Sequence, residues 1–104
     1  MGSPIFISRE NLDRLGLDPT QTTLSLTTAG TEYSFTVPDN TKRLIIGLRS
    51  GSYAFTYGWI TATRNFTVPA GVYRDISDVY LVGKTLFVSC AEAGDQTLEI
   101  EYFL

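Results

Sequence analysis

The sequence predicts an all-β fold, an antiparallel β-sandwich of the jelly-roll type with a short N-terminal arm. The first indication is a change of period at Thr22. From there on, apolar and polar residues alternate, and β-branched and aromatic residues dominate. The second is spacing, because seven or eight short runs of this kind are separated by turns rich in glycine and proline. The third is a tetrapeptide, Phe-Thr-Val-Pro, which ends two of the runs. This combination is typical of antiparallel sandwiches and barrels.

Residues 1–19 are predicted to form an N-terminal arm with one short helical turn. Ser8 is suited to cap a helix that Gly16 ends, and Pro19 disfavours helical angles at the residue before it. Residues 20–104 are predicted to form a single β-sandwich domain, since a chain of 104 residues suffices for one core and no linker divides it.

The individual strands are predicted from alternation and turn residues. Ala29-Gly30 is expected to form a hairpin turn that pairs the run around Leu24 and Leu26 with Thr31–Val37. Leu44–Leu48 is more continuously apolar, so we expect a central strand with both faces largely covered. Further strands are expected at Arg64–Val68, Val79–Val82, Thr85–Cys90 and Thr97–Phe103, with a tight turn at Gly83-Lys84.

The repeated tetrapeptide stands at Phe35–Pro38 and at Phe66–Pro69. Proline cannot donate to a β-ladder, so we expect each copy to end a strand and to send the chain to the other sheet. Each copy also precedes a strand, a glycine-containing turn and a second strand. The two halves are therefore either related by duplication or alike because both use the same strand exit.

Four aromatic residues, Tyr53, Phe55, Tyr57 and Trp59, follow one another at a spacing of two, which places their rings on one face of a strand. Phe55 and Tyr57, in the middle, are expected to lie in the core. Tyr53 and Trp59 are candidate partner-binding residues at a half-solvated rim, since aromatic side chains dominate protein interfaces and also stack on sugars. Packing in the core is the alternative for this outer pair.

A second candidate for partner binding is the apolar triplet Ile5, Phe6 and Ile7. Three consecutive apolar residues in an arm must pack either on the domain itself or on a neighbouring molecule. Both alternatives stay open at the level of the sequence.

Composition and charge exclude several classes of protein. A hydrophobic content of 43% with 18% charged residues fits a globular chain and not a disordered one. The net charge is -3 and the basic residues are scattered, so no nucleic-acid partner is expected. Apolar runs are too short to cross a bilayer and no secretion signal is recognised, so we expect no membrane partner and synthesis in a cytoplasm.

Catalytic residues, metal ligands and cofactor-binding motifs are not expected. The chain has no histidine, and its single cysteine, Cys90, ends a strand-like run in which a free thiol behaves as a small apolar group. Glu99 and Glu101 should point out of the same sheet face. Two carboxylates flanking a cleft can hydrolyse a glycoside, but a solvated strand face explains this pair more simply. We therefore expect no enzymatic activity and no cofactor.

Several stretches resemble small β-sandwich virion structural proteins of tailed bacteriophages. They are Phe66-Thr-Val-Pro-Ala-Gly-Val-Tyr, Val79-Tyr-Leu-Val-Gly-Lys-Thr-Leu-Phe-Val, the final Leu98-Glu-Ile-Glu-Tyr-Phe, and the Leu24–Pro38 segment, which is similar to the first hairpin of such proteins. The resemblance implies a head decoration or cement protein, or another minor virion component. The implied partners are the major capsid protein or another virion protein, and further copies of the chain, since decoration proteins are often trimers.

The leading functional hypothesis is therefore a non-enzymatic virion protein that binds the head surface and stabilises it, located in the virion after synthesis in the host cytoplasm. The alternative is a carbohydrate-binding or receptor-recognition module of a phage tail appendage. In that case the aromatic ladder would be its stacking platform.

Overall fold

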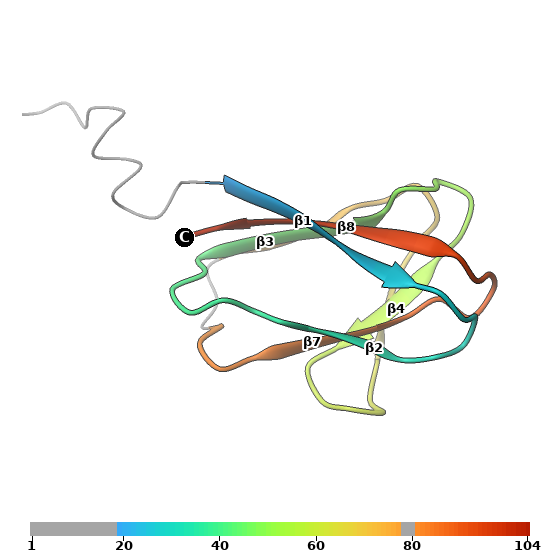
Figure 1. Ribbon diagram of the computed structural model, residues 1–104, viewed down its shortest axis with the longest axis horizontal. Helices are drawn as coiled ribbons and strands as arrows, with labels where there is room; N and C mark the ends of the chain where they lie inside the picture. Colours follow the sequence, from blue (N-terminus) through green and yellow to red (C-terminus); the bar gives the residue numbers. More distant parts are fainter. Residues whose placement is uncertain (1–18, 78–80) are drawn as a thin grey trace, which may run out of the picture.

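The computed structural model describes residues 19–77 and 81–104, which form two four-stranded antiparallel sheets packed as a β-sandwich (Figure 1). The first sheet has the order β1-β8-β3-β6 and the second the order β2-β7-β4-β5. In chain order the strands are β1 (Pro19–Leu26), β2 (Tyr33–Thr36), β3 (Arg43–Leu48), β4 (Phe55–Gly58), β5 (Phe66–Val68), β6 (Arg74–Ser77), β7 (Thr85–Ser89) and β8 (Gln96–Phe103). The predicted antiparallel sandwich is confirmed.

Residues 1–18 of the predicted N-terminal arm lie outside the described residues, together with the helical turn and the candidate binding residues Ile5, Phe6 and Ile7. Pro19, predicted as the last residue of the arm, instead begins β1. In the described part of the chain, the structure has no helix that is long and apolar enough to cross a membrane.

The core lies between the inward faces of the two sheets. On β8, Leu98 and Ile100 are buried while the alternate side chains point outward, as the period of two requires. On β3, Leu44 and Ile46 are fully buried, and the strand is flanked by β8 and β6, so the predicted central strand is confirmed. Among the described residues, the buried apolar side chains are Leu26, Val37, Leu44, Ile46, Leu48, Phe55, Tyr57, Val68, Ile76, Leu81, Leu86, Val88, Cys90, Leu98 and Ile100.

The strand pairs are nested. β1 pairs with β8, β2 with β7, β3 with β6 and β4 with β5, while β8 also pairs with β3 and β7 with β4. Every connection between consecutive strands therefore crosses from one sheet to the other, except for the β4–β5 hairpin. The first strand, β1, and the last strand, β8, are neighbours in the first sheet.

The predicted hairpin at Ala29-Gly30 is wrong. Gly30 does adopt the positive φ of a tight turn, at 76°, but this turn joins β1 in the first sheet to β2 in the second. All eight residues of β1 pair instead with β8. Alternation and turn residues reveal a local reversal of the chain, whereas the pairing partner depends on a strand that lies at the other end of the sequence.

The predicted hairpin around Gly83-Lys84 is wrong in its first strand. The turn exists, because the Lys84 backbone N–H donates to the Leu81 carbonyl at 3.1 Å, and Gly83 has a φ of 73°. However, Leu81 and Val82 do not belong to a strand, and residues 78–80 lie outside the described part. The strand that precedes this turn is instead β6, which lies earlier in the sequence. β6 belongs to the first sheet and β7 to the second, so the two do not pair. β6 was missed because only Ile76 of its four residues faces the core.

Both copies of the repeated tetrapeptide end an edge strand of the second sheet. The first copy includes the end of β2 and the second includes β5, and after Pro38 and Pro69 the chain crosses to the first sheet. The valine of each copy, Val37 and Val68, is buried. The predicted strand exits are confirmed, and the duplication of the two halves stays a hypothesis.

Removing a core side chain should destabilise the sandwich strongly. Leu86 of the central strand β7 is fully buried, whereas Leu104 is 38% exposed. We expect Leu86→Ala to lower the free energy of unfolding by about 2–5 kcal/mol, through lost burial and a residual cavity. The matched variant Leu104→Ala should change it by less than about 0.5 kcal/mol. Urea denaturation measures both, and equal effects of the two variants would contradict this core.

Candidate functional site

The four-residue aromatic ladder is split between core and rim. Phe55 and Tyr57 are 2% and 3% exposed, so their prediction as core residues is confirmed. β4 covers only Phe55–Gly58, and Tyr53 and Trp59 flank it as half-buried side chains packed against the core. The structure separates the two outer residues, because Trp59 lines a surface groove that Tyr53 does not reach.

This edge groove lies where the sandwich opens between the β4–β5 edge of the second sheet and strand β6 of the first. It has a volume of about 320 Å³ and is lined by Tyr57, Trp59, Phe66, Arg74, Ile76, Leu81 and Lys84. Tyr57, Ile76 and Leu81 are buried, so the floor is apolar.

Aromatic rings form one side of the edge groove. Phe66 lies opposite Tyr57 in the β4–β5 ladder, and the two rings stack with centroids 5.8 Å apart. Trp59 meets Tyr57 edge-on, with centroids 6.2 Å apart at 84°. Phe66 is nevertheless 63% exposed, because β5 is an edge strand and no other strand of the described residues covers it. A large apolar ring therefore faces solvent beside a hollow.

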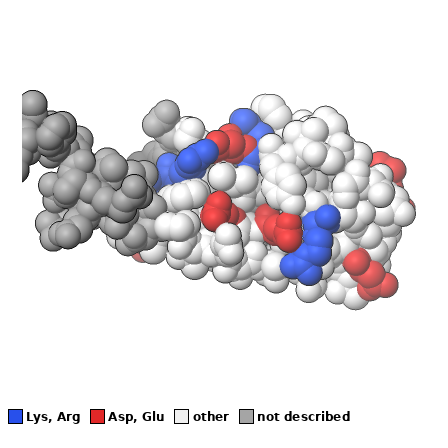
Figure 2. Space-filling view, turned by 90° about the horizontal axis from the view of Figure 1, so that it is seen from above, with Lys and Arg blue, Asp and Glu red and all other residues white. Residues whose placement is uncertain are grey.

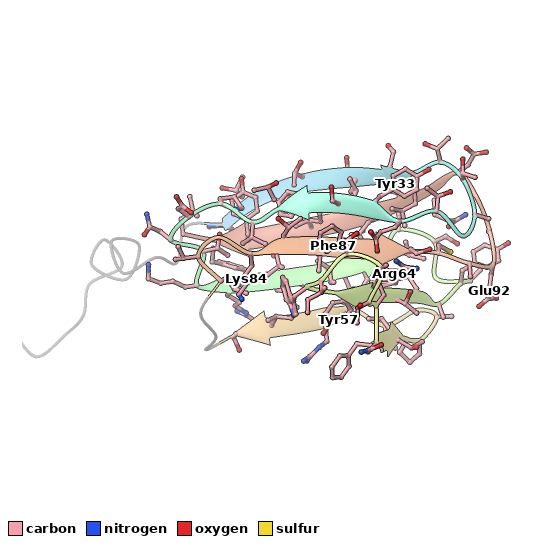
Figure 3. The ribbon with its side chains drawn as sticks, turned by 90° about the horizontal axis from the view of Figure 1, so that it is seen from below. Tyr33, Tyr57, Arg64, Lys84, Phe87 and Glu92 are labelled. Atoms are coloured by element: carbon pink, nitrogen blue, oxygen red, sulfur yellow. The ribbon has the colours of Figure 1, made fainter. Side chains whose placement is uncertain are left out.

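Two basic side chains complete the edge groove. Arg74 donates from Nε to the Tyr57 hydroxyl at 2.9 Å, which holds its guanidinium at the polar tip of that ring. Lys84 comes from the turn before β7, and Figure 3 labels it together with Tyr57. Among the residues that the structure describes, none that lines the groove is acidic. The groove therefore combines apolar contact area with positive charge.

The hairpin that carries Trp59 and Phe66 is held to the rest of the domain by Glu32. Its carboxylate accepts hydrogen bonds from the Thr61 hydroxyl at 2.7 Å and from the Ala62 backbone N–H at 2.8 Å, and forms an ion pair with Arg64. The Thr61 hydrogen bond is the main cause that lowers the pKa of Glu32. These contacts fix the β4–β5 loop before any partner arrives.

A second surface lies on the outer face of the first sheet, where acidic and basic side chains are interspersed (Figure 2). It contains a hollow of about 390 Å³, which we call the sheet hollow, lined by Gln21, Thr22, Thr23, Ile45, Arg49, Tyr73, Glu99, Ile100 and Glu101. Glu99 and Glu101 both line it, which confirms the prediction that the two side chains point out of the same sheet face. Tyr73, Arg49 and Gln21 were missed, because no sequence pattern links them to β8.

The carboxylate of Glu99 is held by two other side chains that line the sheet hollow. Its Oε1 accepts a hydrogen bond from the Tyr73 hydroxyl at 2.6 Å, and its Oε2 accepts one from Arg49 Nε at 3.0 Å. The Tyr73 hydrogen bond, followed by that of Arg49, lowers the pKa of Glu99, and the same carboxylate raises the pKa of Tyr73. Beside them, Gln21 Nε2 donates to Glu101 at 3.0 Å.

This arrangement is suited to hydrogen bonding more than to acid catalysis. A glycosidase acid needs a raised pKa, so that it carries a proton at neutral pH, and the pKa of Glu99 moves in the opposite direction. Within residues 19–77 and 81–104, no group of three or more histidine, cysteine, aspartate or glutamate side chains is placed to hold a metal ion. Cys90 is buried, as predicted for a structural thiol.

Acid should destabilise the domain in part through Glu99. A carboxyl group with a lowered folded-state pKa stabilises the fold above its unfolded pKa, near 4.5, and this contribution is lost as the pH falls through the folded value. We expect the unfolding temperature to fall between about pH 6 and about pH 3, and to fall less in Glu99→Gln. Glu92→Gln, on the β7–β8 connection, is the control. An unchanged pH dependence in Glu99→Gln would contradict the Tyr73–Glu99–Arg49 contacts.

Function must be inferred from the geometry and chemistry of these two surfaces. Comparisons with protein-family models, with curated proteins and with solved structures find no match to this chain.

Proposed function

We propose that this chain is a non-enzymatic structural protein of a phage virion, a capsid decoration or cement protein that binds the head surface and stabilises it. The observation that carries the proposal is the edge groove. It places the exposed ring of Phe66 on an edge strand, in a groove that Trp59, Tyr57 and two basic side chains also line. Exposed apolar surface with a polar rim marks protein interaction sites, and open strand edges are sites of pairing with other chains.

The nested strand pairing supports the proposal at the level of fold. The pairing of β1 with β8, β2 with β7, β3 with β6 and β4 with β5 across two sheets supports the proposal that the sandwich is a jelly roll. Jelly rolls are frequent in viral capsid proteins and in lectins. This support is an analogy of fold, because one fold hosts many functions.

Attachment to a shell suits a small domain of this kind. The partner would be the major capsid protein or another virion protein, and an acidic patch on its surface would complement Arg74 and Lys84. One edge groove offers a small interface. Many copies, or a homo-oligomer, multiply such interfaces, so that the overall affinity exceeds that of a single contact.

The second candidate function is a carbohydrate-binding or receptor-recognition module of a tail appendage. It is favoured by Trp59, whose half-buried indole lines the same edge groove and whose ring is of the type that stacks on sugars. In this case, Trp59→Ala would abolish binding to specific glycans on an array.

Binding to particles tests the leading proposal. Phe66→Ala should weaken binding of the purified protein to virions that lack it by about 30-fold, the effect of losing a central aromatic contact. Because Phe66 is 63% exposed, the free energy of unfolding should change little. Deleting Ile5–Ile7 should also reduce occupancy if the arm contacts the shell. Co-sedimentation at increasing protein concentration gives the affinities.

Ile60→Ala is the matched control for this experiment. Ile60 is 65% exposed and belongs to the same hairpin, but it does not line the edge groove. Particle binding should therefore be unchanged in this variant. Full occupancy by Phe66→Ala would reject the edge groove as the docking surface, and the absence of any particle binding by the unaltered protein would reject the virion role.

A further inference from the structure

The ring of Tyr73 lies flat on the outer face of the first sheet. Tyr73 stands directly before β6, and continuing the β3–β6 register places it opposite Gly47. Its hydroxyl nonetheless reaches Glu99 on β8, at 2.6 Å, although β3 lies between these two strands. Neighbouring strands are about 4.8 Å apart, so the side chain spans this distance only by lying along the sheet and crossing β3.

Gly47 provides the space for the ring. A Cβ atom built at this position would stand 2.2–2.5 Å from three carbons of the Tyr73 ring, closer than any real contact. The missing side chain therefore lets the ring rest on the backbone of β3, with one face toward the sheet. Tyr73 is still 49% exposed, so its opposite face is open to solvent. An aromatic platform of this kind is already in place before a ligand binds.

The groups around the platform offer donors and acceptors side by side. Each oxygen of Glu99 is used once, by Tyr73 and by Arg49, and a carboxylate oxygen has two lone pairs. Arg49 uses one of its five N–H donors in this contact, and its side chain is 62% exposed. Glu101, two residues along β8, accepts from Gln21. A flat apolar surface beside fixed donors and acceptors matches the apolar face and the hydroxyl groups of a sugar ring.

We propose that the sheet hollow binds a neutral saccharide, with Tyr73 as the stacking platform and with Glu99, Glu101 and Arg49 as the groups that bind hydroxyls. The charges of the hollow argue for a neutral ligand. Arg49 is balanced by Glu99, and Glu101 adds a further negative charge, which repels phosphate, uronate or sialate. An apolar peptide is disfavoured because it would strip water from two carboxylates without replacing their hydrogen bonds.

This site is independent of the proposed virion role. It shares no lining residue with the edge groove. The hollow is present whether or not the protein belongs to a virion. Particle binding and saccharide binding can therefore succeed or fail separately.

The test is binding of the full chain to a glycan array of neutral and acidic oligosaccharides, followed by titration of the best neutral one. Tyr73→Ala should weaken binding by about tenfold, which corresponds to about 1.4 kcal/mol of lost stacking on one ring. Gly47→Ala should weaken binding as well, because the added methyl group displaces the Tyr73 ring. This variant keeps the tyrosine and its hydroxyl, so it tests the position of the ring alone. Val72→Ala, at a neighbouring exposed position outside the hollow, should bind normally.

A titration of the unaltered protein, followed by nuclear magnetic resonance, keeps the test independent of how the variants fold. A neutral saccharide should shift the backbone amide signals of Gly47, Tyr73 and Glu99. Shifts confined to Trp59 and Phe66 would place the sugar in the edge groove and overturn the proposal. So would preference for acidic glycans, or no binding of any neutral saccharide at millimolar concentration.

Discussion

The pairing of β8 with both β1 and β3 is the constraint on which the first sheet depends. β8 lies in the interior of this sheet although it is the last of the described strands. Among the described strands, β1 pairs with β8 alone. The inward residues of β8, Leu98 and Ile100, are almost completely buried. Its outward residues, Glu99 and Glu101, supply the carboxylates of the sheet hollow. β8 thus contributes to the core with one face and to the sheet hollow with the other.

The edge groove follows from how the two sheets end. β5 and β6 are edge strands of different sheets, and between them the apolar interior reaches the surface. Phe66 lies opposite Tyr57, so both side chains are on the same face of the sheet. Tyr57 is buried there, whereas Phe66 is exposed because it belongs to the edge strand. Glu32 holds the hairpin in place through Thr61, Ala62 and Arg64, so the exposed ring is presented in one position. An exposed ring beside an apolar hollow is a feature of interaction sites, which supports a role in contact with a partner.

The sheet hollow depends on one glycine. Gly47 lies in a central strand, where glycine weakens the ladder because it offers no side chain to pack. Here the missing side chain seats the ring of Tyr73, and the Tyr73 hydroxyl in turn holds Glu99. The space left by Gly47 on β3 is therefore filled by a residue that stands directly before β6. Glycine within a strand marks close approach of another group, and this approach created a surface that the alternation pattern does not reveal.

By itself, the sequence determined properties that depend on neighbouring residues. Alternation gave the β class, the burial of Phe55 and Tyr57 and the outward direction of Glu99 and Glu101, and proline gave the two strand exits. Only the tertiary structure decided which strands pair, so the hairpin expected at Ala29-Gly30 became a crossing between sheets. It also decided the contact of Tyr73 with Glu99, 26 residues away in the chain. The physical reason is that side-chain direction is a local property of an extended backbone, whereas strand pairing and the contacts across it join segments whose separation in sequence carries no periodic signal.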